Sequence, residues 1–254
     1  MNSVLVYVIV LLLYFCILLT VGFVSQKKTK STEDYHIGGR NIGALVSAFS
    51  FVAAYYSSVV IIGGGGFGYK YGMSSIWVGA TNVLVGCFLA WLILGKRTRR
   101  LSKKLDAITI PDLFGKIYKS QFIKIFSATI ISIFLIIYNV SILKGLGNTF
   151  EVILDIPYIW GLIITGAIVL IYVSLGGYFA VVWTGFIQGL IMVFGLIALL
   201  FVTLNKVGGL TVGANMLREI DVGYVETPGI WGLNGLLSYA LVVSLGVWGM
   251  PQMV

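Results

Sequence analysis

Long apolar runs separated by short polar stretches dominate the chain. Seven runs approach the roughly 20 residues that an α-helix needs to cross a bilayer core about 30 Å thick. Apart from Lys124 at the start of one run, none of them contains Asp, Glu, Lys or Arg. The pattern therefore predicts a single transmembrane domain with seven helices, at residues 4–24, 42–62, 76–94, 123–143, 158–175, 181–204 and 233–254.

Composition and charge placement support a lipid environment. Apolar residues make up 59% of the chain and charged residues only 10%, whereas a soluble domain carries about 25% charged residues. The net charge of +8 is compatible with nucleic-acid binding in principle. The basic residues, however, are confined to short stretches between apolar runs, so we expect the lipid bilayer, and no nucleic acid, as a partner.

The distribution of basic residues predicts the orientation. Residues 26–40 carry four Lys or Arg and residues 96–124 carry nine, out of 17 in the chain. With seven crossings both stretches lie on the same side of the membrane, and loops rich in Lys and Arg stay in the cytoplasm. We therefore expect a multi-pass protein of the cell membrane with its N-terminus outside.

Two loops carry signals for short helices. Pro111 followed by Asp112 suits the first turn of a helix, which we expect to extend to about Tyr118. A second short helix is expected around residues 215–220, in a polar external loop. The last apolar run continues to Val254 with no polar segment after it, and we expect the chain to be a portion of a longer protein.

The second apolar run is rich in small and hydroxyl-bearing residues. It contains Ser47, Ser50, the stretch 53–58 and then four glycines at 63–66. One interpretation is a tight packing face between helices, since small residues let backbones approach. The other is a discontinuous helix whose carbonyl groups line a cavity and bind a cation.

The sixth and seventh runs also contain unusual positions. In the seventh, Pro251 interrupts the helix between Trp248 and Gln252, which favours either a simple kink or a solute site with one stacking face and one polar group. In the sixth, Thr184 and Gln188 are four residues apart and share one helix face. Such polar residues face a cavity or make a structural hydrogen bond.

Several of these pieces together resemble the sodium/solute symporter family, which includes sodium/proline, sodium/pantothenate and sodium/glucose transporters. The resemblance extends from about Ser3 to Val254. Its most specific piece is Gly176-Gly177 followed by Trp183-Thr184 and Gln188. Three further pieces support it in the same order: Asp34-Tyr35 with Gly38-Gly39-Arg40, Thr109-x-Pro111-Asp112, and Trp248-Gly249-x-x-Gln252.

The resemblance implies an all-α membrane fold of the LeuT type, built from two inverted five-helix repeats. The run 4–24 would be one extra N-terminal helix, and the next five runs would form the first repeat. The run 233–254 would begin the second repeat, whose remaining helices we expect to be missing from this chain and needed for activity.

The resemblance also implies the site residues. The backbone carbonyls of Ala53 and Tyr56 are expected to bind sodium, with further ligands from the second repeat. Many relatives have aspartate after the Trp-Thr pair, where this chain has Gly185, so a sodium contact or a coupling role is not expected there. Solute contacts are expected at Ala54, Tyr55, Ser57, Trp248, Gly249 and Gln252.

The expected function is sodium-coupled symport of a small organic solute by alternating access. Sodium is the coupling ion, and the solute is an amino acid, carboxylate, vitamin or sugar. An enzyme is not expected, because the predicted spans offer no acids, bases or metal ligands at depth. The alternative is a membrane sensor or solute-binding module without coupled transport, which binding without sodium-dependent flux would favour.

Overall fold

The computed structural model describes residues 3–27, 29, 31–38, 42–56 and 58–250. These residues form helices, and no strand occurs among them. Two compact units are present, and each combines segments distant in the sequence. The first contains Met1–Val59 and Phe126–Met192, and the second contains Val60–Ile125 and Val193–Val254.

Among the residues that the structure describes, five helical segments are long and apolar enough to cross a membrane, and a sixth is added if α3 (Ala44–Tyr55) and α4 (Ser58–Tyr71) form one broken span. The prediction of an all-α, multi-pass membrane protein is therefore confirmed, whereas the count of seven crossings stays a prediction. The five segments are Leu5–Gln26, Ser75–Lys104, Gln121–Leu154, Tyr158–Val207 and Gly229–Trp248.

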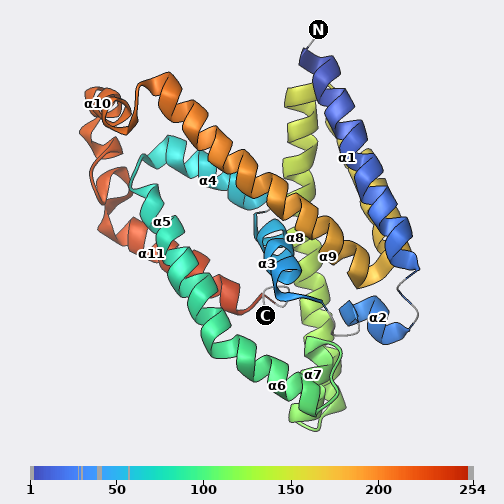
Figure 1. Cartoon of the computed structure of the whole chain (residues 1–254). Helices are drawn as coiled ribbons and strands as arrows, with labels where there is room; N and C mark the ends of the chain where they lie inside the picture. Colours follow the sequence, from blue (N-terminus) through green and yellow to red (C-terminus); the bar gives the residue numbers. More distant parts are fainter. Residues whose placement is uncertain (1–2, 28, 30, 39–41, 57, 251–254) are drawn as a thin grey trace. The chain divides into compact units, whose positions relative to one another are not determined.

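The helix α9 (Tyr158–Val207) consists of two helices joined at a sharp turn, as Figure 1 shows in yellow and orange. At 1.5 Å per residue its 50 residues would extend about 75 Å if straight, more than twice a bilayer core. The turn falls at Gly177, whose φ of 54° and ψ of −143° are open essentially only to glycine. The Gly176-Gly177 pair therefore forms a tight turn between the two parts of α9.

In the first unit, the helix α1 (Ser3–Gln26) packs against both parts of α9. Leu18, Tyr172 and Ala180 form the buried centre of this contact. A Cβ on Gly22 would lie 2.8 Å from the Cβ of Tyr172, so the absent side chain is what lets the two backbones approach. This packing places the Gly177 turn near the end of α1.

A short helix that the sequence analysis did not predict follows α1. It is α2 (Thr32–Ile37), and the Ser31 hydroxyl and the Asp34 carboxylate cap its start reciprocally. Gly38, at φ 61°, ends it. The signal was present in the sequence as Ser-x-x-Asp, a variant of the capping box.

This short helix contacts the Gly177 turn. A Cβ on Gly177 would lie 2.6 Å from the Tyr35 ring, and the Thr29 hydroxyl donates to the carbonyl of Gly176 at 3.1 Å. Two pieces of the family-like pattern, far apart in sequence, therefore meet at one place.

In the second unit, one continuous helix runs from Ser75 to Lys104. It comprises α5 (Ser75–Thr81), the π-helical segments η2 (Asn82–Leu89) and η3 (Trp91–Gly95), and α6 (Lys96–Lys104). The helix was expected to stop at residue 94. It continues because Lys, Arg and Leu are good helix formers even where the chain becomes polar.

Longer helices than expected also occur elsewhere. The helix α8 (Gln121–Leu154) continues 11 residues past the predicted end, and α10 (Leu210–Ile220) starts five residues before the expected one.

Short 3₁₀ turns, η4 (Val222–Tyr224) and η5 (Gly229–Trp231), lead into α11 (Gly232–Trp248). α11 packs against α5 and η2.

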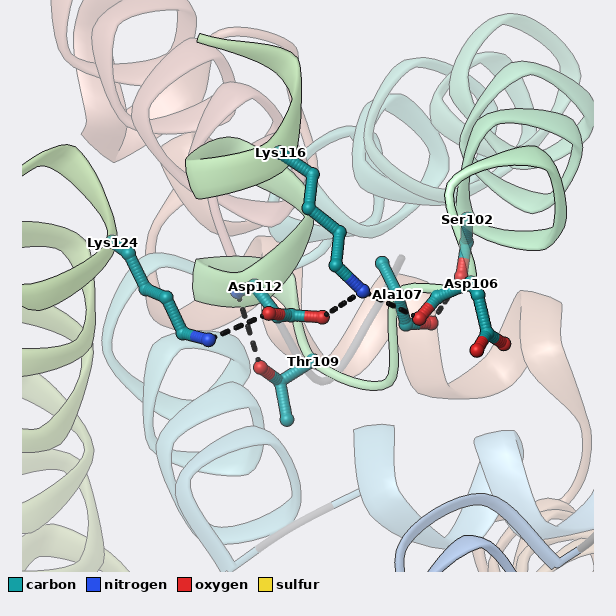
Figure 2. Close-up of polar contacts among 7 residues, drawn as sticks. All are labelled: Ser102, Asp106, Ala107, Thr109, Asp112, Lys116 and Lys124. Atoms are coloured by element: carbon teal, nitrogen blue, oxygen red, sulfur yellow. Dashed lines mark hydrogen bonds and ion pairs between the residues drawn. The ribbon is translucent and has the colours of Figure 1, made fainter. Parts of the chain in front are cut away.

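The short helix predicted from Pro111 is confirmed as α7 (Ile110–Ile117). Thr109 caps it by accepting a hydrogen bond from the backbone N–H of Asp112 at 3.2 Å. Figure 2 shows the Asp112 carboxylate between two lysines, with Lys124 at 2.7 Å and Lys116 at 2.9 Å. Lys124 first, and then Lys116, lower the pKa of Asp112 to about 2.

We expect Asp112→Asn to loosen α7 locally without unfolding the protein. Ion pairs with exposed lysines contribute about 1 kcal/mol or less each, and the amide removes both. Amide hydrogen exchange in residues 110–117 should accelerate by about fivefold. Glu219→Gln, at an exposed position of α10, is the matched control and should leave this exchange unchanged.

The lowered pKa of Asp112 also predicts a pH dependence. The two ion pairs of the Asp112 carboxylate stabilise α7 fully above the ordinary carboxyl pKa of about 4. This stabilisation is lost as the pH falls from about 4 towards 2, because the carboxylate becomes protonated. Exchange in α7 should therefore be constant between pH 5 and 8, after correction for the intrinsic exchange rate. Acceleration within that window would contradict the assignment.

Candidate cation and solute site

The second apolar run is broken where the sequence indicated. α3 ends at Tyr55 and α4 begins at Ser58. Tyr56 has φ −75° and ψ 57°, so its carbonyl is turned by about 100° from the direction it would take in a helix. The backbone N–H of Tyr56 still donates to the carbonyl of Val52 at 2.8 Å. The discontinuous helix is thus present, and Ser57 lies outside the described residues.

The end of α3 has the electrostatics that a cation prefers. Ala53 lies in the last turn, where carbonyl groups have no partner further along the same helix. The aligned peptide dipoles place partial negative charge at this end of the helix. The carbonyls of Ala53 and Tyr56 are neutral oxygen groups, the chemical kind that hard cations take as ligands.

The aromatic residues beside the break are held by their own helix. The Tyr55 ring stacks on Phe51 one turn earlier, with centroids 5.9 Å apart. It also meets the Tyr56 ring edge to face, at 6.3 Å. Ala54 is exposed, and its methyl group leaves the backbone accessible beside these rings.

Another part of α3 rests on the second part of α9. A Cβ on Gly185 would lie 2.7 Å from the Ser50 hydroxyl oxygen, and one on Gly189 would overlap the carbonyl oxygen of Phe49. The Phe49 ring meets Phe186 edge to face at 5.7 Å. Gly185 is therefore a helix-contact position in this chain, and an aspartate side chain would not fit there without separating α3 from α9.

Thr184 and Gln188 make structural contacts on the same part of α9. The Thr184 hydroxyl, only 1% exposed, donates to the carbonyl of Ala180 at 2.8 Å. The Gln188 side chain interacts with the Tyr14 hydroxyl of α1. The sequence allowed either a cavity-facing role or a structural hydrogen bond for these two residues, and the contacts favour the structural hydrogen bond.

The predicted solute residues of the seventh run lie at the end of α11. The helix ends at Trp248, with Gly249 as its C-cap, and Gln252 lies outside the described residues. The indole N–H of Trp248 donates to the carbonyl of Val85 at 2.9 Å. Val85 belongs to the π-helical segment η2, and such segments are frequent at functional sites.

Two polar residues that the sequence analysis passed over complete the contact between α11 and η2. The Asn82 amide donates to the carbonyl of Val243 at 3.2 Å. The hydroxyl of Ser244 is fully buried and has no hydrogen-bond partner within the described part of the chain. Gly86 lies between them, since a Cβ there would be 3.1 Å from the carbonyl of Ser244. In the sequence, the single asparagine within this apolar run was the feature that could have indicated a polar contact here.

The predicted site residues therefore fall into two groups. Ala53, Ala54, Tyr55 and Tyr56 lie together at the break after α3, in the first unit. Trp248 and Gly249 lie together at the end of α11, in the second unit. The first group lies at the break between α3 and α4, and the second lies where the candidate span Gly229–Trp248 ends.

Among the described residues, five long apolar helices and one broken helix pair define a polytopic α-helical membrane protein. The family model described as the sodium:solute symporter family matches residues 35–254. This match covers most of the chain, and the protein belongs to that family.

Individual relatives agree with this assignment. The osmoregulated proline transporter OpuE of Bacillus subtilis is 35% identical over 248 residues, covering 95% of this chain and 49% of the relative. The sodium/pantothenate symporter of Haemophilus influenzae is 34% identical, covering 91% and 48%. Sodium/proline symporter 2 of Staphylococcus saprophyticus is 30% identical, covering 97% and 48%. The chain thus spans about half the length of these relatives, and no solved structure matches it.

Proposed function

We propose that this chain is part of a secondary active transporter that couples sodium entry to the uptake of a small organic solute. Its membership of the sodium:solute symporter family is the observation that carries the proposal. The names of the relatives identify proline and pantothenate as solutes of those proteins, and we propose a small carboxylate-bearing solute of this kind here. The residues of the site bind and do not perform covalent chemistry.

Sodium binds at the break after α3 in this proposal. The carbonyls of Ala53 and Tyr56 contribute two neutral ligands at the negative end of the helix dipole. Two carbonyls do not replace a hydration shell, so the remaining oxygen ligands come from the second repeat. The membrane potential drives the ion inward, with about 2.3 kcal/mol per charge for each 100 mV.

In this proposal, residues near two helix ends contribute to solute binding. Ala54, Tyr55 and Ser57 contribute from the break after α3. Trp248, Gly249 and Gln252 contribute from the end of α11 and the residues that follow it in the sequence. Alternating access then moves one repeat against the other around this site. The proposed frame is the LeuT-type one, with the extra helix first, the first repeat next, and the second repeat beginning at α11.

The direct test is uptake by the complete open reading frame that contains this chain. Vesicles are energised with a sodium gradient or with a matched choline gradient, and labelled proline and pantothenate are offered separately. We expect accumulation of a solute at least tenfold higher with sodium. Solute binding without sodium-dependent accumulation would instead favour a sensor or binding module.

We further propose seven crossings with the N-terminus outside, the turn at Gly177 dividing α9 into two. Single cysteines at Thr32, Lys103 and Thr211, in a chain with Cys16 and Cys87 replaced by serine, test this arrangement; all three positions are exposed. In intact cells an impermeant thiol reagent should label the cysteine at position 211 and spare the other two. Labelling at 32 and 103, with protection at 211, would reverse the orientation.

A further inference from the structure

The longest continuous helix of the second unit passes from an apolar to a strongly basic stretch over a few residues. Ser75 to Gly95 is apolar apart from a few small polar residues, whereas α6 carries six basic residues in nine positions. All six are exposed, and none of them forms an ion pair with any residue that the structure describes. The six are Lys96, Arg97, Arg99, Arg100, Lys103 and Lys104.

The length of this helix places the change of character at the membrane boundary. The 21 residues from Ser75 to Gly95 extend about 30 Å, which matches the hydrocarbon core. The headgroup layer adds about 5–8 Å on each side. Lys96, Arg97, Arg99 and Arg100 fall within that layer, whereas Lys103 and Lys104 extend into water beyond it.

The same residues line a recess on the helix surface. Leu92 and Ile93 form its apolar end, and Lys96, Arg97 and Arg100 form its basic end. The π-helical segment η3 ends at Gly95, which lies in the sequence between the apolar and the basic residues of the recess. Because a π-helix has more residues per turn than an α-helix, residues four and five apart align along it, which brings Lys96 and Arg97 into register with Leu92.

We propose that this recess binds the headgroup of an anionic phospholipid. The phosphate contacts Lys96, Arg97 and Arg100, and the start of an acyl chain lies against Leu92 and Ile93. Basic residues directly beyond a membrane span attract anionic lipids, and each contributes about fivefold in affinity near the surface. An apolar wall joined to a basic end fits a lipid, whereas a soluble phosphate would use only the basic end.

The test measures binding of short-chain phosphatidylglycerol and phosphatidylcholine to the purified chain in neutral detergent, by native mass spectrometry. We expect phosphatidylglycerol to bind at least tenfold more tightly. The triple variant Lys96→Gln, Arg97→Gln, Arg100→Gln should lose this preference. The matched triple Arg99→Gln, Lys103→Gln, Lys104→Gln removes the same charge and should change the affinity less than threefold.

Two further measurements distinguish a specific lipid site from diffuse charge attraction and from binding of a soluble phosphate. Arg100→Gln alone should weaken binding about fivefold, which covers the case in which the triple variant does not fold. Glycerophosphoglycerol, the headgroup without acyl chains, should not displace the lipid at equal concentration. Equal losses in the two triple variants would mean diffuse charge attraction and overturn the site. Displacement by the soluble headgroup would overturn the lipid as ligand.

Discussion

Gly189→Ala should lower the free energy of unfolding by about 3 kcal/mol, a large effect for the addition of one methyl group. The added Cβ would overlap the backbone carbonyl oxygen of Phe49, on α3. A backbone atom cannot rotate away as a side chain can, so α9 and α3 have to separate. Thermal unfolding of the purified chain in detergent, monitored by size-exclusion chromatography, would measure the loss of stability.

The matched control lies on the same helix. Among the described residues, apart from the backbone of its own helix, a Cβ on Gly195 would meet no atom within 4 Å, so Gly195→Ala adds a methyl group in open space. Because alanine favours helix more than glycine does, this change should leave stability unchanged or raise it by up to about 1 kcal/mol. Equal destabilisation by the two substitutions would show that the contact with Phe49 is not the cause.

Loss of the Trp248 side chain should weaken solute binding strongly. The proposed site places this ring against the solute, and buried aromatic anchors contribute more than about 1.4 kcal/mol, or tenfold, when truncated. In the complete transporter we expect Trp248→Ala to raise KM for uptake at least tenfold. Trp248→Phe keeps an aromatic face but loses the hydrogen bond to the carbonyl of Val85, so a smaller rise is expected.

Trp160 provides the control for this prediction. It lies on α9 with 55% of its surface exposed. Trp160→Ala should change KM less than twofold. If Trp248→Ala alters the amount of folded protein but not KM, the tryptophan serves only the contact between α11 and η2, and the solute site lies elsewhere.

Local sequence was sufficient where the controlling physical effect is local. The apolar runs predicted long apolar helices of a membrane protein, because the side chains of about 20 consecutive residues set the free energy of transferring a helix into lipid. Pro111 and Asp112 predicted α7, since capping involves only residues three or four apart. The break in the second run was indicated by its small and hydroxyl-bearing residues and is present at Tyr56.

Contacts between distant segments could not be predicted in the same way. The sequence contains 32 glycines, and nothing local distinguishes Gly189, where an added Cβ would overlap Phe49, from Gly195, where it would meet no described atom outside its own helix. The difference arises because close packing depends on which helix face meets which neighbour. The docking of Tyr35 on the Gly177 turn has the same origin.

The sequence by itself thus determined that this chain is an all-α, multi-pass membrane protein and that one of its apolar helices is interrupted. Only the tertiary structure decided what Gly185, Asn82 and Trp248 contact. A stretch of 20 residues sets its own transfer energy into lipid, whereas a contact between α3 and α9 forms only when both backbones have taken their places.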